Sequence, residues 1–198
     1  MNKEQKSIGC YTYEDFLSWT DVRCELIDGV QKLMAGVSEW HANVSWKLTC
    51  FIDRIKTNSN NQKYFIFRAP FDVILFPEEE CLKVKTVVQP DFGICLKEKR
   101  KGRVIIGAPE FLIEITSSNP AYDYTTKFDL YQRAGVLEYW IISPREGIIT
   151  VYIYDEIQKK YMEPSVHELD IYSEKTVKST VIEGIDIVLS ELFDYSDL

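Results

Sequence analysis

Residues 107–144 read GAPEFLIEITSSNPAYDYTTKFDLYQRAGVLEYWIISP, and this stretch decides the fold. Its first part, 110–117, is rich in Ile and Phe and predicts a strand, and 118–122 contains an Asn-Pro pair and predicts a loop. Asp123 can cap a helix that runs to about Ala134 and is closed by Gly135. EYWII is a short apolar run typical of a strand buried on both faces. The unit is therefore strand, helix, strand, which makes its two strands parallel with a right-handed crossover.

The residues before this unit predict a hairpin, a long helix and two more strands. Asp28-Gly29 lies between two apolar segments and predicts a hairpin over 22–35, because both turn positions need positive φ. An amphipathic helix starts at Ser38 and ends at TNSNN, 57–61. Strands at 63–76 and 86–96 follow. The central order is α-β-β-β-α-β, an α/β (α+β) class of fold.

The two ends of the chain add smaller elements to this core. A short capped helix follows Thr12, a strand covers 147–157, and two or three weaker strands lie between 161 and 188. We expect Ser190 to cap a last helical turn. Without an internal repeat, linker or composition break, the sequence predicts a single domain over 1–198, with its core at about 38–143, the hairpin at 22–35 and C-terminal strands at 147–195.

Composition limits the function classes. The 198 residues include 31 acids and 23 bases, so the net charge of −8 repels polyanions and any nucleic-acid contact needs a local basic patch. Five scattered cysteines without a CxxC pair support neither a zinc ribbon nor a disulfide framework. The N-terminus has no apolar signal region, and no apolar run approaches the ~18 residues that span a bilayer. We therefore expect a cytoplasmic protein without a membrane partner.

Two acids on neighbouring predicted strands are the first candidates for chemistry. In FLIEITS, Glu114 shares a strand face with Leu112 and Thr116, and Asp91 follows Pro90, which cannot donate to a ladder. If the two strands form a hairpin through a loop at 97–107, Asp91 and Glu114 come close together. Mg²⁺ or Mn²⁺ would then remove their repulsion, since hard ions prefer oxygen ligands. The alternative is that Asp91 only ends a strand and Glu114 pairs with a lysine.

Lys127 has apolar neighbours on its own face of the predicted helix, among them Leu130 and Tyr131, so it points inward or snorkels along the sheet. It either neutralises two carboxylates and a phosphate, or simply pairs with Glu114.

The loop at 97–103 has five basic residues and one acid, a local balance of +4. It could grip phosphate, but such a run is also typical of a solvated turn. The basic residues are Lys97, Lys99, Arg100, Lys101 and Arg103.

Several motifs together resemble a known family. They are ELIDG at 25–29, SEWH at 38–41, VVQPD at 87–91, GAPEFLIEITSSNP at 107–120 and KFDLYQRAGVLEYWIISP at 127–144. This set resembles the large putative restriction endonuclease family of the PD-(D/E)XK nuclease superfamily, over about residues 10–195. The resemblance implies a restriction endonuclease-like fold and metal-dependent hydrolysis of nucleic acid.

The resemblance also implies roles for single residues. Asp91 and Glu114 become the two acidic residues of the motif, and with the backbone carbonyl of Ile115 they would hold Mg²⁺ or Mn²⁺. The lysine of the motif should be residue 116, but this sequence has Thr116 there. Lys127 looks like its replacement from the next helix. Catalysis would then rest on Asp91, Glu114 and Lys127.

Two further acids are candidates for the metal site, Asp72 on the preceding strand and Glu39 in the first turn of the long helix, where a helix N-terminus favours negative charge anyway. His41 is expected to be a partly buried helix residue without a catalytic role. The expected partner is nucleic acid, DNA first, and a homodimer is compatible with exposed strand edges. The rival functions are an inactive binding or interaction module on the same scaffold, and a hydrolase of small phosphorylated molecules.

Overall fold

The computed structural model describes residues 9–34, 36–56, 62–77, 80–117, 120–170 and 172–196, with the backbone alone for 53–56. Helix α2 (Glu39–Lys56) lies where the long amphipathic helix is predicted. The TNSNN stretch expected to end it lies outside the described residues, as do two residues of the predicted loop at 118–122.

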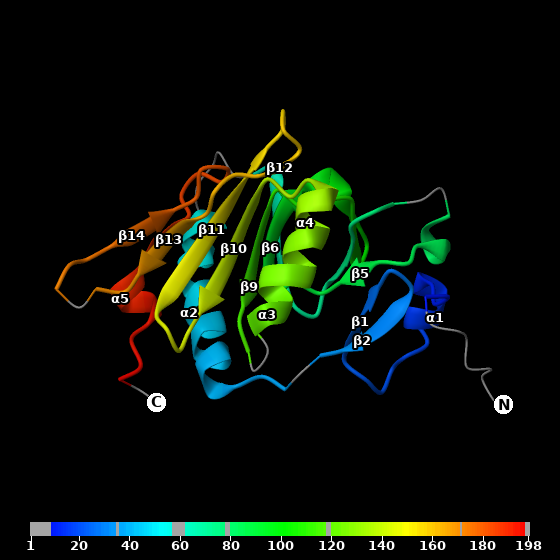
Figure 1. The fold of residues 1–198 in the computed structure, drawn as a ribbon, viewed down its shortest axis with the longest axis horizontal. Coiled ribbons are helices and arrows are strands. Elements are labelled where there is room, and N and C mark those ends of the chain that lie inside the picture. The colour runs from blue at the N-terminus through cyan, green and yellow to red at the C-terminus, as the bar shows by residue number, and fades with distance from the viewer. Residues whose placement is uncertain are drawn as a thin grey trace.

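A large sheet forms the centre of the molecule (Figure 1). Its strands are β3 (Tyr64–Arg68), β6 (Phe92–Leu96), β9 (Phe111–Ile115), β10 (Glu138–Ser143), β11 (Ile148–Asp155), β12 (Lys160–Tyr161) and β13 (Ser165–Glu168). The order is β12-β11-β10-β9-β6-β3, and β13 also pairs with β11. β9 and β10 are parallel, as predicted, whereas β3, β6 and β9 pair antiparallel. The α-β-β-β-α-β core is therefore confirmed.

Helices cover both faces of this sheet (Figure 1). Chain alternation along β9 sends Phe111 and Ile113 into one apolar cluster with Leu48 of α2. Leu112 points the other way and packs with Leu130 of α4 (Phe128–Ala134). Glu114, two residues after Leu112, therefore belongs to the α4 face, beneath the helix that carries Lys127.

The helix over that face differs from the prediction at its start. It begins as a short α-turn, α3 (Pro120–Tyr122), continues as a π-helical turn at Asp123–Lys127, and becomes α4 only afterwards. Asp123 is thus inside the helix and is not its cap. The predicted end is confirmed, because Gly135 closes α4 at φ +79°.

A second, smaller sheet carries the N-terminal hairpin. Its strands are β1 (Cys24–Ile27), β2 (Val30–Leu33), β4 (Asp72–Ile74), β5 (Val87–Val88), β7 (Arg100–Lys101) and β8 (Val104–Ile106), in the order β2-β1-β5-β4-β8-β7. The predicted hairpin is confirmed, and Asp28 and Gly29 turn it at φ +47° and +75°. α1 (Tyr13–Phe16) packs against this sheet, and the Asp15 carboxylate accepts a hydrogen bond from Thr12 N at 2.9 Å.

Three predictions about the chain between the sheets were wrong. The segments 63–76 and 86–96 are each two strands, one in either sheet, because the chain passes between the sheets near Pro70 and Pro90, which cannot donate to a ladder. The predicted loop at 97–107 contains β7, β8 and a 3₁₀ turn at Lys97–Lys99, because β8 adds a parallel strand to β4.

The C-terminal part covers the α2 side of the large sheet. It contains β14 (Thr176–Lys178), β15 (Asp186–Val188) and α5 (Leu189–Leu192), whose N-cap is Val188 and not the predicted Ser190. The fully buried Glu138 of β10 ties this part down, since it accepts hydrogen bonds from Trp140 Nε1 at 2.6 Å and Ser179 Oγ at 2.8 Å. A further 3₁₀ turn, Cys81–Lys83, precedes β5.

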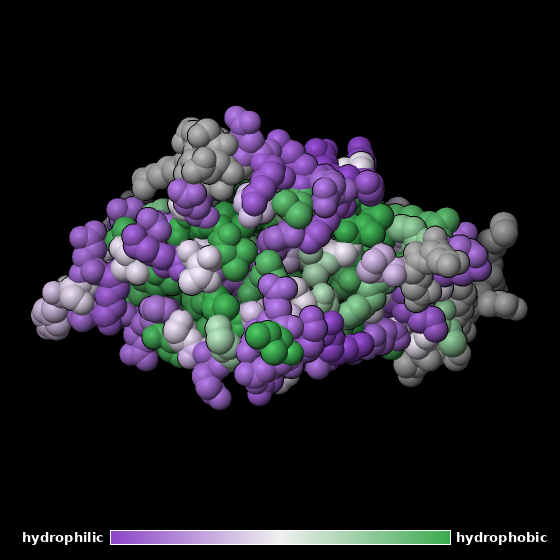
Figure 2. Space-filling view, turned by 90° about the horizontal axis from the view of Figure 1, so that it is seen from above, coloured by the Kyte–Doolittle hydropathy of each residue, from purple (hydrophilic) through white to green (hydrophobic). Residues whose placement is uncertain are grey.

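Hydrophilic side chains cover much of the face shown in Figure 2, with smaller groups of hydrophobic residues between them. In the described part of the chain, no helix combines the length and apolar character needed to cross a membrane.

Candidate active site

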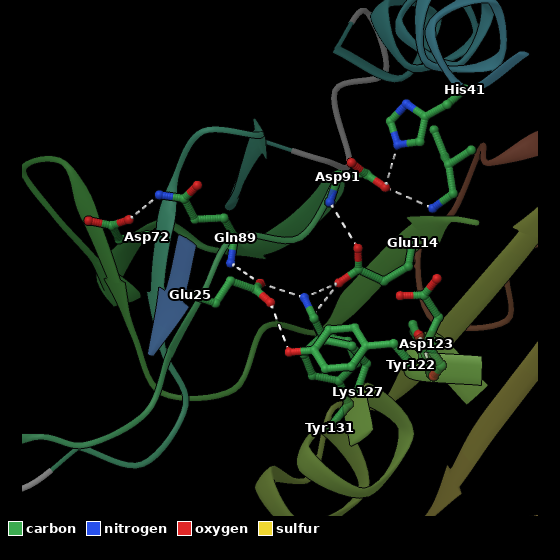
Figure 3. A network of polar contacts seen from close by, with 12 residues as sticks. Glu25, His41, Asp72, Gln89, Asp91, Glu114, Tyr122, Asp123, Lys127 and Tyr131 are labelled. Carbon is green, nitrogen blue, oxygen red and sulfur yellow. Dashed lines mark hydrogen bonds and ion pairs between the residues drawn. The ribbon is translucent and has the colours of Figure 1, made fainter. Parts of the chain in front are cut away.

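The β6–β9 pairing brings Asp91 and Glu114 together. Phe92 pairs with Ile113, so the preceding Asp91 lies opposite Glu114. The backbone N–H of Asp91 donates to Glu114 Oε2 at 3.4 Å, and the N–H of Ile115 donates to Asp91 Oδ2 at 2.8 Å (Figure 3). The two carboxylates therefore meet where the strand following Pro90 begins.

Lys127 reaches both acids of a buried pair. Its Nζ donates to Glu114 Oε1 at 2.9 Å and to Glu25 Oε1 at 2.5 Å, and the Lys127 side chain is only 3% exposed. Tyr131, one turn further along the helix, also donates to Glu114 Oε1. Thr116, at the position expected for a lysine, is buried two residues beyond Glu114. The ammonium group thus comes from the helix and not from the strand.

Glu25 joins the N-terminal hairpin to this cluster. It accepts hydrogen bonds from Gln89 N at 2.7 Å and Tyr122 OH at 3.2 Å, in addition to the one from Lys127. Glu25 was not among the site residues predicted from the sequence. One signal could have identified it, a carboxylate inside the apolar strand CELI, which is costly to bury without a positive partner.

Asp123 is a further acid that the sequence analysis took only for a helix cap. The π-helical turn places it four residues before Lys127, and both line the same pocket. Burial raises the pKa of Asp123 to about 7; Lys127 opposes this rise and Asp91 adds to it. The spacing of Asp123 and Lys127 on one helix face was the signal available in the sequence.

The cluster holds more carboxylates than cations. Burial raises the pKa of Glu114 to about 8; Lys127 opposes this rise, while Asp91, Asp123 and Glu25 add to it. Burial alone would lower the pKa of Lys127, but Glu114 and Glu25 raise it well above its usual value. The lysine is therefore charged, and the excess negative charge around it favours a further cation.

His41 of α2 completes the upper side of the site in Figure 3. Its Nε2 lies 3.1 Å from Asp91 Oδ2, while its buried Nδ1 has no hydrogen-bond partner among the described residues. His41 is a partly buried helix residue, as predicted, but its contact with Asp91 was not predicted.

The two additional acids proposed from the sequence lie elsewhere. Glu39 is exposed and does not line the pocket. Asp72 is on β4 in the smaller sheet, where Gln89 Nε2 donates to its carboxylate at 2.8 Å and Tyr13 OH donates at 3.3 Å. Burial raises the pKa of Asp72, and its two hydrogen bonds oppose the rise. Asp72 reaches the cluster only indirectly, through Gln89 and Glu25.

The basic segment at 97–103 also lies away from the pocket. Asp91 and Lys97 are at opposite ends of β6, and at ~3.4 Å per residue this separates them by about 20 Å. Lys99 is used within the fold, since it donates to Ala108 O at 2.6 Å and to Glu110 Oε1 at 2.5 Å. Arg100 lies over the ring of Phe65 at 4.3 Å.

The site opens into a cavity of about 410 Å³. Its floor is formed by the buried or half-buried Glu25, His41, Asp91, Glu114 and Lys127. The exposed Arg23, Lys32, Leu33 and Val37 line it toward solvent, from the hairpin and the segment after it.

This arrangement agrees with a family assignment. A model of the Uma2 family, described as putative restriction endonuclease, matches residues 13–181. The chain belongs to this family. The fold of the chain is also similar to that in the crystal structure of a putative nuclease belonging to DUF820 from Anabaena variabilis, with a TM-score of 0.70 at 17% sequence identity over 92% of this chain and 97% of that one. A comparison with curated proteins found no match.

The oxygen donors of this Uma2 chain fit a hard divalent cation. Asp91 and Glu114 supply carboxylates, and the resemblance adds the backbone carbonyl of Ile115. Glu114 Oε1 is occupied by Lys127 and Tyr131, but Oε2 receives only the long bond from Asp91 N among those described. With the side chains in these positions, the described residues include no group of three or more His, Cys, Asp or Glu that could hold a metal ion. Binding would thus depend on Asp91, Glu114 Oε2 and backbone or water oxygens.

Proposed function

We propose that this protein is a Mg²⁺- or Mn²⁺-dependent nuclease of the PD-(D/E)XK type that hydrolyses phosphodiester bonds in nucleic acid, with DNA as the first candidate. The observation that carries the proposal is the convergence of Asp91, Glu114 and Lys127 from β6, β9 and the π-helical turn in one pocket. Family membership supports the same class of activity.

In this proposal Asp91, Glu114 and the Ile115 carbonyl hold the cation. A cation bound there would supply Lewis-acid chemistry, which favours attack of water on a phosphate. Lys127 orients the attacking water or offsets negative charge that develops on the phosphate. Tyr131 and Glu25 hold Glu114 and Lys127 in place through the hydrogen bonds described above. No covalent intermediate with the protein is required.

The test is cleavage of single- and double-stranded DNA and RNA by the purified protein in Mn²⁺. The matched variants are Asp91→Asn and Glu114→Gln, with Asp72→Asn as a half-buried acid outside the pocket. We expect cleavage to be lost in the first two and kept by folded Asp72→Asn. Cleavage that survives both pocket substitutions would rule out this site.

The second candidate is a nuclease-fold module that binds without turnover. Thr116 at the usual lysine position and the engagement of Glu114 Oε1 by Lys127 and Tyr131 favour it. Calorimetric titration with Mn²⁺ separates the two, since an intact fold that takes up no Mn²⁺ points to the module.

We place this activity in the cytoplasm. Cys24, Cys50, Cys81 and Cys95 form no disulfide bond among the described residues, which suits a reducing compartment. We also propose that the protein forms a homodimer, and a measurement of its molecular mass in solution tests this.

A further inference from the structure

Two cations stand at the mouth of the candidate active site. Arg23 and Lys32 line the cavity and are exposed, whereas the acids Glu25 and Glu114 on its floor are buried. A ligand that enters this cavity passes the two cations before it reaches the carboxylates.

The hairpin register explains why both side chains face the cavity. Glu25 pairs with Lys32 across β1 and β2, so the two share a face of the sheet. Arg23 is two residues before Glu25, and Met34 N donates to Arg23 O at 2.9 Å, which continues the ladder. Glu25 reaches Lys127 from this face (Figure 3), and Arg23 and Lys32 therefore extend over the same side.

Neither cation is held by a carboxylate within ion-pair distance among the described residues, although Lys32 lies across the hairpin from Glu25. Within the described ranges, no ion pair involves Arg23 or Lys32, in contrast to Lys99 and Lys127, which are held by carboxylates. Arg23 and Lys32 thus bring two positive charges to the acid-lined cavity of a chain whose net charge is −8. An anionic ligand that spans the cavity mouth is the chemistry that uses them.

We propose that Arg23 and Lys32 bind backbone phosphates of a nucleic-acid strand next to the phosphate held at Asp91 and Glu114, so that the β1–β2 hairpin is the strand-binding wall of the site. This inference rests on the proposed nuclease function and assigns its substrate contacts. The basic residues that contact nucleic acid would then be those of the hairpin. The basic segment 97–103, which the sequence suggested for this contact, lies at the far end of β6. Phosphate contacts position the strand without reading its sequence.

The salt dependence of binding tests this assignment. Log affinity for duplex DNA falls with log salt by about 0.9 for each phosphate contact, and by about 0.7 for single strands. The test variant is Arg23→Gln with Lys32→Gln, and the matched control is Lys101→Gln with Arg103→Gln, also exposed. Each pair removes two positive charges, so both change the net charge equally and only the location differs.

Fluorescence anisotropy with labelled single- and double-stranded oligonucleotides, in Ca²⁺ and in EDTA, measures affinity without relying on turnover. We expect the R23Q/K32Q protein to lose about 2 contacts, which is a slope shallower by about 1.8 on duplex DNA. The control pair keeps the wild-type slope. Circular dichroism should show both variants folded, because the substituted side chains are exposed.

The outcomes separate the inference from the proposed function. Two results would overturn the hairpin assignment and leave the nuclease proposal intact. One is an equal loss of affinity in both double variants. The other is an unchanged affinity and salt slope in R23Q/K32Q while the wild type binds and cleaves. A wild type that binds no polynucleotide overturns both. Binding of free nucleotides alone, weakened in R23Q/K32Q, also overturns the strand assignment and indicates a small phosphorylated substrate.

Discussion

The ammonium nitrogen of Lys127 lies 2.9 Å from Oε1 of Glu114, with both side chains at most 6% exposed. Because the same nitrogen also contacts Glu25, one cation holds together the hairpin, the central strand β9 and the helix over the sheet. The geometry of the candidate active site and part of the stability of the fold therefore depend on one side chain.

Replacing Lys127 by Met should destabilise the protein by about 3 kcal/mol, because removal of one partner leaves buried carboxylates without compensation. Urea unfolding at pH 7 measures the loss. The matched control is Lys101→Met on the exposed β7, which should change stability by less than about 0.5 kcal/mol. Equal losses of stability from the two substitutions would contradict a stabilising role for the buried contacts of Lys127 with Glu114 and Glu25.

Stability of the metal-free protein should fall as the pH rises from about 5 to about 8. Burial raises the folded-state pKa of Glu114 to about 8 from its ordinary value of 4.5, so the folded state binds the proton more tightly. This contribution is fully present below the unfolded pKa and is lost as pH passes the folded one. Thermal unfolding in EDTA should show this decline in the wild type and a weaker one in Glu114→Gln. A wild-type stability that rises over this range argues against the shift.

Asp123→Asn should weaken Mn²⁺ binding about 10-fold, because Asp123 adds negative charge to the pocket close to Asp91. Glu39→Gln is the control, since Glu39 is exposed and outside the pocket. Calorimetric titration compares the two. If Glu39→Gln has the larger effect, the acid proposed from the long helix takes the place that we give to Asp123.

Glu138→Ala should lower stability by about 3 kcal/mol without weakening Mn²⁺ binding in the folded protein. Glu138 is fully buried, and its removal leaves the donors Trp140 Nε1, Ser179 Oγ and Thr180 N without the acceptor that they share. For a chain of this size, the loss corresponds to a fall in Tm of about 6–12 °C. Reduced Mn²⁺ affinity in folded Glu138→Ala would show that the two regions are coupled.

Local signals predicted the frame of the site. Alternation in FLIEITS indicated that Glu114 turns away from Ile113, and helical spacing indicated an inward Lys127. Each of these depends on neighbours a few residues apart, which the sequence shows directly.

The remaining site residues depend on contacts between distant segments or on an irregular turn of the helix. Glu25 meets Lys127 across 102 residues, and no local pattern specifies that pairing. Asp123 has the residue type of a helix cap, and the π-helical turn that directs it into the pocket has no equally simple signature. The predicted strands are divided near Pro70 and Pro90 because the chain passes from one sheet to the other there. Only the strand order of the complete fold shows this.

The most direct test of the account is anomalous diffraction from a crystal soaked in Mn²⁺. We predict a manganese peak within bonding distance of carboxylate oxygens of both Asp91 and Glu114, with Lys127 Nζ still beside Glu114. A peak bound elsewhere, or a fully soaked crystal without manganese between Asp91 and Glu114, would contradict the proposed metal-dependent site.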